Sequence, residues 1–182
     1  TVLSIIAYTG RAPSSEIGSG IPSELSPSGA FPKTWRIVDG RRVLYKAAHD
    51  DGLGLEPVSE YLASQVAEAM RLPHVAYDLA VWQGRLCSTC ELMNDATASF
   101  VPFAYAIDRD AKDDMNLERA LAYFGGFGGD AVQQFCSMLV FDAVIMNPDR
   151  HMGNYGVLRD NETGRVLGFA PIFDNNLALL PQ

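Results

Sequence analysis

The sequence predicts an α+β fold of two lobes that share a cleft, with a β-rich first half and a helical second half. Alternating apolar residues and turn signals dominate as far as Asn94, whereas segments with helical spacing follow Asn116. A chain of 182 residues is long enough for two such small lobes. We place the boundary after Asn94, which gives a first lobe at 1–94 and a second at 95–182.

Composition and charge narrow the set of partners. The chain has 14 basic and 22 acidic residues, a formal net charge of −8. Because such a chain repels phosphate backbones, we expect no direct nucleic-acid binding. Three cysteines are too few for a disulfide framework, and an odd number suits a reducing compartment. No apolar run approaches the ~18 residues of a membrane span. We therefore expect a cytoplasmic protein without a membrane partner.

The first half reads as a small sheet with one helix. Residues 9–34 are dense in Gly, Pro and Ser and predict loop. Residues 35–48 predict a hairpin that turns at Asp39-Gly40, and residues 74–93 predict a second pair of strands. Between the two pairs, residues 56–72 carry apolar side chains at helical spacing.

The second half reads as two helices followed by a hairpin. Residues 116–124 and 130–146 show helical periodicity, and the second of these is apolar enough to be a core helix. The glycine cluster at 125–129 predicts the connection between them. Residues 155–160 and 166–174 then predict two short strands joined by a turn.

A polar loop between the core helix and this hairpin carries the candidate chemistry. In "NPDRHMGNYG", four residues separate Asp149 from Asn154, the same separation as in the protein-kinase catalytic loop H-R-D-x-x-x-x-N. Asp174 follows one hairpin later, where kinases place the D-F-G aspartate. Magnesium-dependent phosphoryl transfer needs a carboxylate near the attacking hydroxyl and oxygen ligands for the metal. Each residue alone is more typical of a turn, but the set favours an active site.

These segments resemble the HipA-like serine/threonine kinases, the toxin kinases of bacterial toxin–antitoxin modules. "NPDRHMGN" resembles their N-x-D-x-H-x-x-N loop, and "IFDN" resembles their metal site. The resemblance implies a bilobal protein-kinase-like fold, distantly similar to phosphoinositide kinases, with ATP and Mg²⁺ as cofactors. It implies that Asp149 acts as base or hydroxyl positioner, that Asn154 and Asp174 bind magnesium, and that His151 orients the loop. Arg150 is a plausible charge partner.

A kinase also needs a strand lysine that reaches the phosphates and a helix glutamate that holds it. Lys46 lies at the end of a predicted strand, and Glu60 lies in the first turns of the next helix. Glu60, Ser64 and Ala67 are spaced i, i+4 and i+7, so small side chains would let the glutamate approach a sheet. Glu56 is the alternative partner. "SEYLASQVAEAM" resembles the family's N-E-Y-x-x-x-x-L-A segment, which favours Glu60.

A phosphate-binding loop is the next requirement. "SPSGAFPKT" resembles the family's S-x-x-G-A-Q-P-K-T loop, with phenylalanine in place of glutamine. The resemblance implies that Ser28, Gly29, Ala30 and Lys33 contribute to nucleotide binding, with glycine letting backbone amides approach phosphate oxygens. Ser26 matches a serine that family members can autophosphorylate, which ejects the loop.

The segment "CELMND" falls where a hinge between the lobes is expected. It resembles the family's E-R-F-D hinge, which implies backbone contacts from Glu91 and Met93 to adenine. Cys87 and Cys90 form a single C-x-x-C just before it. One such pair without a suitably spaced histidine is a weak zinc or redox signal, so we interpret both as strand residues.

The resemblance covers Leu25 to Asn176 in five ordered segments. It implies transfer of phosphate from ATP to a protein Ser or Thr hydroxyl. One alternative is a lipid or small-molecule kinase, because D-R-H-x-x-N occurs there as well. Another is a catalytically inactive nucleotide- or partner-binding module. Family members continue with further helices after the metal aspartate. The sequence is therefore either a fragment or a reduced version whose missing helices are supplied otherwise, by an antitoxin or another partner for which the apolar "LALL" near the end is a candidate contact.

Overall fold

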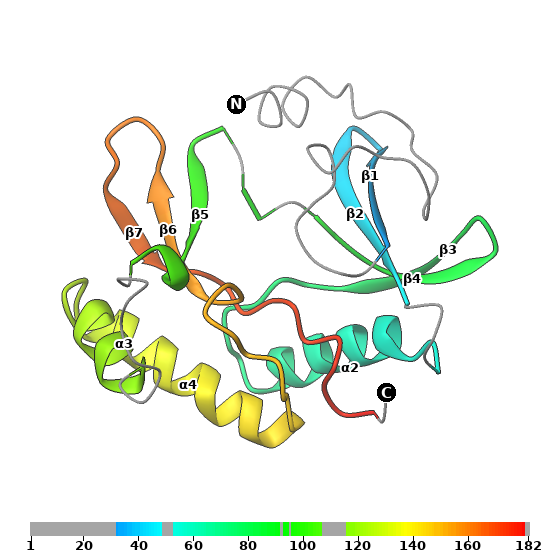
Figure 1. The fold of residues 1–182 in the computed structure, drawn as a ribbon. Helices are drawn as coiled ribbons and strands as arrows, with labels where there is room; N and C mark the ends of the chain where they lie inside the picture. Colours follow the sequence, from blue (N-terminus) through cyan, green and yellow to red (C-terminus); the bar gives the residue numbers. More distant parts are fainter. Residues whose placement is uncertain (1–31, 49–52, 92, 95, 107–115, 181–182) are drawn as a thin grey trace.

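The computed structural model describes residues 32–48, 53–91, 93–94, 96–106 and 116–180. In this part of the chain, two antiparallel sheets lie side by side above the α-helices (Figure 1). In chain order the elements are β1 (Lys33–Val38), β2 (Arg41–Ala47), α2 (Glu56–Ala69), β3 (Asp78–Trp82), β4 (Arg85–Glu91), β5 (Ala98–Pro102), the 3-10 helix η1 (Phe103–Tyr105), α3 (Asn116–Gly125), α4 (Gly129–Ile145), β6 (Gly156–Asp160) and β7 (Val166–Phe169).

The first sheet has the strand order β1-β2-β4-β3 and is antiparallel throughout. Both of its hairpins turn through two residues with positive φ, Asp39 (50°) with Gly40 (79°) and Gln83 (50°) with Gly84 (76°). Two consecutive positive φ angles match the right-handed twist of the strands that they join. Both predicted strand pairs are therefore confirmed.

Helix α2 lies beneath this sheet (Figure 1). Small side chains make up much of its buried face. Pro57 lies in its first turn, where a missing N–H costs nothing. Ser64 and Ala67 are buried on the same face as Glu60, as the i, i+4, i+7 spacing predicted. The helix ends at Ala69, three residues before the predicted end.

The second sheet has the order β5-β6-β7 and contains a strand that the sequence did not predict. β5 pairs with β6, and its short segment "ASFVP" acquires strand character only from that partner. The strand predicted at 166–174 is too long, since β7 ends at Phe169. Ala170 still donates its N–H to Gly156 O at 2.9 Å, and beyond it the chain leaves β6 and joins the connection after α2, where Ile172 donates its N–H to Pro73 O at 2.9 Å.

The main core lies between the second sheet and helices α3 and α4. Aromatic rings dominate it, and the Phe124 ring contacts Phe103, Phe135, Tyr155 and Phe169 at centroid distances of 5.0 to 6.2 Å. A smaller cluster on the first sheet contains Tyr45, Ala47 and Cys87. The two clusters give each sheet its own apolar support.

The end of the described chain returns to α4. Ala178 is fully buried in the main core, and Leu179 packs against that core while its N–H donates to Ile145 O at 2.9 Å. These two residues of "LALL" therefore pack against the chain itself, and a partner contact of this segment stays a prediction. The predicted boundary after Asn94 falls between β4 and β5, and the division into two domains stays a prediction.

Candidate active site

The polar loop after α4 is shaped by its own side chains. Met146 ends the helix in the left-handed conformation, with φ of 52°. The Asn147 side chain accepts a hydrogen bond from Asp149 N–H at 3.1 Å and donates one to Asp142 Oδ1 at 3.0 Å. Pro148 cannot continue the helix. This Asn-Pro turn presents the half-buried Asp149 immediately after the core helix.

Asn154 and His151 close the same loop. Asn154 is buried, and its Nδ2 donates to Asp149 O at 3.3 Å, which leaves its amide oxygen as the atom for another ligand. Its backbone N–H donates to His151 O at 2.9 Å. The exposed His151 ring accepts a hydrogen bond from Gly153 N–H at Nδ1, at 3.0 Å. His151 thus supports the backbone of the loop. The hydrogen bond from Asn154 Nδ2 to Asp149 O joins the other two residues within the same loop.

The first lobe supplies a buried ion pair. Lys46 near the end of β2 donates to Glu60 Oε2 in α2 at 3.2 Å, the contact that the sequence predicted. The Glu60 side chain is completely buried, and its Oε1 accepts a hydrogen bond from Asn175 N–H at 2.6 Å. Both carboxylate oxygens therefore have donors, as a buried charge requires.

Asp174 joins this pair from the far end of the chain. The Lys46 ammonium also donates to Asp174 Oδ1 across 128 residues of sequence. The Asp174 side chain keeps 31% of its surface exposed, compared with 0% for Glu60. Its φ of 58° lies in the left-handed region that non-glycine residues rarely adopt. One lysine thus faces two carboxylates, of which only Asp174 is open to a ligand.

The pKa values follow from burial and from these charges. Burial alone lowers the pKa of Lys46, but Glu60 and Asp174 outweigh it and raise that pKa above the ordinary value. Burial raises the pKa of Asp174, yet Lys46, with smaller effects from Lys33 and Arg150, holds it below the ordinary value. Complete burial raises the pKa of Glu60 despite the neighbouring lysine. The pKa values of the two acids therefore shift in opposite directions, upward for Glu60 and downward for Asp174.

Lys33 adds a second ammonium to the cluster. It lies directly opposite Lys46 in the β1–β2 register, so both side chains leave the same face of the sheet. Burial and then Lys46 lower the pKa of Lys33, while Asp174 and Glu60 oppose that shift. Of the predicted phosphate-loop residues, Ser28, Gly29 and Ala30 lie outside the described residues. Ser26 lies outside them too.

Arg150 connects the loop to the segment around Asp174, a role that the sequence indicated only as that of a charge partner. Its guanidinium forms a two-oxygen ion pair with Asp142 and also contacts Asn154 O, Phe173 O and the Asn175 side chain. Asp142 and Asn175 were not predicted as site residues. The available sequence signals were a polar side chain within an apolar helix for Asp142, and the position next to "FD" for Asn175.

Tyr77 is a second residue that the sequence did not predict. Its hydroxyl accepts a hydrogen bond from Asp174 N–H at 3.4 Å, and its own N–H donates to Ser64 Oγ at 3.1 Å. Burial and the nearby Glu60 carboxylate place its pKa well above the ordinary value. Tyr77 therefore stays a neutral phenol beside the cluster. No local sequence pattern indicates its role, because it lies in an irregular connection between α2 and β3.

The predicted hinge lines an open groove of about 820 Å³. Glu91 and Met93 contribute to its wall together with Cys90 and Leu158, so the groove reaches from β4 to the second sheet. Tyr77, which contacts Asp174, lines it as well. Adenine contacts at Glu91 and Met93 stay a prediction.

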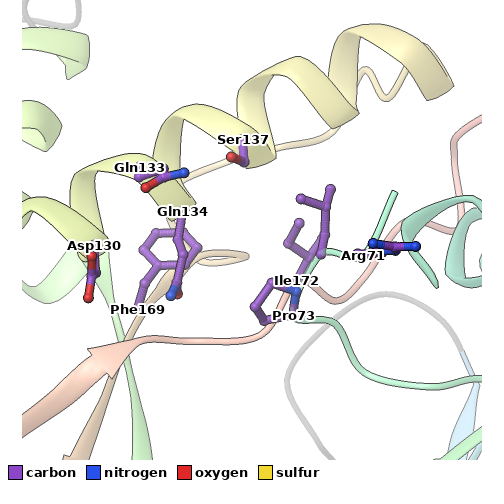
Figure 2. Close-up of a pocket in the computed structure, with 9 residues that line it drawn as sticks. Arg71, Pro73, Asp130, Gln133, Gln134, Ser137, Phe169 and Ile172 are labelled. Carbon is purple, nitrogen blue, oxygen red and sulfur yellow. The ribbon is translucent and has the colours of Figure 1, made fainter. Parts of the chain in front are cut away.

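A smaller cavity of about 250 Å³ lies on α4, away from these residues (Figure 2). Asp130, Gln133 and Ser137 of α4 face Pro73 and Ile172 across it. None of its lining residues belongs to the predicted site. Within the described ranges, no group of three or more His, Cys, Asp and Glu side chains could hold a metal ion. Cys87 and Cys90, in line with our interpretation, are free thiols within β4.

Comparisons with known proteins add a fold-level finding. No protein-family model and no curated protein matches the sequence. Among solved structures, the Helicobacter pylori proinflammatory kinase CtkA matches with a TM-score of 0.66 and 23% identity, over 82% of this chain and 56% of that one. The protein has a HipA-like kinase fold. HipA of Shewanella oneidensis MR-1, solved with HipB and operator DNA, matches with a TM-score of 0.57 and 14% identity, over 88% of this chain and 45% of that one.

The HipA-like kinase fold confirms the predicted α+β, kinase-like architecture. The chain spans about half the length of these two proteins, and at such identities the likeness concerns the fold alone. In the part of the chain that the structure describes, no helix is long and apolar enough to cross a membrane.

Proposed function

We propose that this chain carries the catalytic centre of a kinase that uses ATP and Mg²⁺ to phosphorylate a Ser or Thr hydroxyl of a protein. One observation carries the proposal. Lys46, Glu60 and Asp174 come from distant parts of the sequence and meet in one largely buried cluster of a fold that two kinases share. Titratable groups with perturbed pKa values that lie together are typical of functional sites.

Lys46 is the proposed phosphate ligand. Glu60 is fully buried and accepts a second hydrogen bond from Asn175 N–H, so it cannot leave the lysine. Asp174 is partly exposed and can exchange its contact with Lys46 for another. In the proposed complex, Lys46 keeps Glu60 and turns its remaining donors to the α- and β-phosphates. Lys33, on the same face of the sheet, adds positive charge.

Asn154 and Asp174 are the proposed magnesium ligands. Both offer oxygen atoms, which Mg²⁺ prefers, and the Asn154 amide nitrogen is already engaged with Asp149 O. Two protein ligands suit Mg²⁺ because it usually takes its remaining ligands from phosphates and water. Mg²⁺ held there would neutralise charge on the phosphates.

Asp149 is the proposed residue that aligns the acceptor hydroxyl. The Asn147 side chain holds its backbone N–H, and Asn154 holds its carbonyl, so its position is set from both sides. Its half-buried carboxylate leaves room for an incoming hydroxyl. His151 keeps the intervening loop in shape through Gly153 N–H.

A protein partner on the second lobe completes the proposal. The second half of α4 exposes the apolar residues Leu139, Val140 and Val144, and exposed Met146 follows at its end. The HipA neighbour was solved together with HipB, which supports a partner such as an antitoxin. Replacing Val140 and Val144 by Glu should raise the solubility limit of the isolated chain at an unchanged unfolding midpoint. Equal solubility would count against a covered face.

The proposed activity is tested by phosphoryl transfer. The purified chain is incubated with ATP and Mg²⁺, alone and with a bacterial lysate, and added phosphate is located by mass spectrometry. We expect phosphate on Ser or Thr residues, a loss of at least about a hundredfold in rate for Asp149→Asn, and an unchanged rate for the control Glu162→Gln in an exposed turn.

Nucleotide binding separates the alternatives. Thermal stabilisation by ADP with Mg²⁺, lost in Lys46→Met, combined with no transfer to any acceptor would support the inactive binding module. Transfer to a lipid or small molecule but not to protein would support a lipid or small-molecule kinase. Phosphate that appears equally with Asp149→Asn would overturn the assigned mechanism.

A further inference from the structure

Arg150 uses every donor that its side chain has. Nε donates to Asp142 Oδ2 at 3.0 Å, and Nη2 donates to Asp142 Oδ1 at 3.0 Å. Nη1 donates to Asn154 O at 3.1 Å and to Phe173 O at 2.6 Å, and Nη2 also reaches Asn175 Oδ1. A guanidinium has five N–H donors in a fixed plane, so all five are engaged.

The acceptors belong to three separate segments. Asp142 lies in α4, Asn154 ends the polar loop, and Phe173 and Asn175 stand on either side of Asp174. The side chains of Arg150 and Asp142 are only 6% and 10% exposed. The rigid helix thus anchors a planar group that holds the other two segments at a fixed separation.

This arrangement also accounts for the unusual backbone at Asp174. A positive φ at a non-glycine residue persists only where its surroundings enforce it. Arg150 holds the carbonyl before Asp174 and the side chain after it, while Glu60 holds Asn175 N–H. Hydrogen bonds on both sides therefore keep the backbone of Asp174 in this conformation.

We propose that Arg150, anchored by Asp142, is a positioning residue that sets the separation between Asn154 and Asp174 and so pre-forms the magnesium site. This inference rests on the proposed function of that site. Arginine is required because a lysine ammonium has three donors and no planar fork, and so cannot serve Asp142, Asn154 O and Phe173 O together. Groups behind metal ligands commonly tune metal affinity in this way.

Three variants test the proposal. Arg150→Lys keeps the charge but loses the fork, and Asp142→Asn keeps the shape but loses the two-oxygen ion pair. Arg159→Lys is the matched control on the exposed face of β6. Mn²⁺ binding to the ADP complex is titrated by electron paramagnetic resonance, ADP binding without metal by calorimetry, and backbone amide exchange at 173–176 by mass spectrometry without any ligand.

We expect Arg150→Lys to weaken Mn²⁺ binding about 10- to 100-fold, with metal-free ADP binding within about threefold and faster amide exchange at 173–176. Asp142→Asn should show the same pattern more weakly, which keeps the test valid if Arg150→Lys does not fold. In a kinase assay the Mg²⁺ concentration for half-maximal rate should rise in both variants. Arg159→Lys should change none of these quantities.

The results distinguish the two proposals. Unchanged Mn²⁺ binding in folded Arg150→Lys and Asp142→Asn would overturn the positioning role, even if wild type is an active kinase. Altered Mn²⁺ binding and amide exchange without any transfer by wild type would support the positioning role and refute the kinase activity. A lower unfolding midpoint with wild-type metal binding would mark Arg150 as purely structural.

Discussion

Gly156→Ala tests how tightly the strands beside the polar loop are packed. Gly156 begins β6 opposite Pro102 of β5. A Cβ atom there would lie closer than 3.0 Å to Val101 O and 3.0 Å from both Phe103 N and Pro102 Cα. Ordinary van der Waals contact begins at 3.4 Å. All three obstacles are backbone atoms, which cannot rotate away, so the strands must separate.

The cost can be estimated from these contacts. Inserting a methyl group into a packed interior costs about 1–3 kcal/mol. Separation also weakens the hydrogen bonds from Phe103 N–H to Tyr155 O and from Ala170 N–H to Gly156 O, both 2.9 Å, each contributing about 1 kcal/mol. We therefore expect the free energy of unfolding to fall by about 2–5 kcal/mol, which lowers Tm by roughly 5–15 °C for a chain of this size.

Urea unfolding followed by circular dichroism measures this change. Gly129→Ala is the control, because Gly129 lies in the first turn of α4 and a Cβ atom there meets nothing within 4 Å. It should be neutral or stabilise by up to about 1 kcal/mol. A Gly156→Ala protein within about 0.5 kcal/mol of wild type would refute the close approach of β5 and β6.

Two further predictions concern titratable groups. Because Lys46 depresses the folded-state pKa of Asp174, this pair stabilises the fold above the ordinary aspartate pKa of about 3.9, and the stability is lost as pH falls through the lower folded value. Wild type should therefore lose more stability than Asp174→Asn in urea titrations between about pH 5 and 3; parallel losses would contradict the ion pair. Among the thiols, exposed Cys136 should react first with Ellman's reagent at pH 8. Burial raises the pKa of Cys90 to about 12 and Cys87 is buried, so both should react at least about a hundredfold more slowly; three equal rates would contradict this.

Local chemistry explains what could be predicted from the sequence. The turns at Asp39-Gly40 and Gln83-Gly84 depend on neighbouring residues alone, and the helices depend on spacing within one segment. The contact of Lys46 with Glu60 spans only 14 residues and follows from a strand that leads into a helix with a small-residue face. These features therefore agree between sequence and structure.

The errors lie where distant segments decide. β5 is a strand only because β6 pairs with it, and β7 ends early because Ile172 pairs with the connection after α2 instead of with β6. No local sequence pattern predicts the role of Tyr77, because the partner of its hydroxyl, Asp174, comes from a distant part of the chain. Pairings across such sequence distances depend on packing and cannot be deduced from local periodicity.

The sequence by itself determined the chemical groups and their local spacing, such as Asp149 and Asn154 within one loop after a core helix. Only the tertiary structure decided that Lys46 faces two carboxylates of unequal exposure, and that Arg150 joins Asn154 to the residues beside Asp174. The physical reason is the sequence distance over which each kind of interaction acts. Backbone preference acts over a few residues, whereas a buried charge takes its partners from whatever the folded core brings within hydrogen-bonding distance.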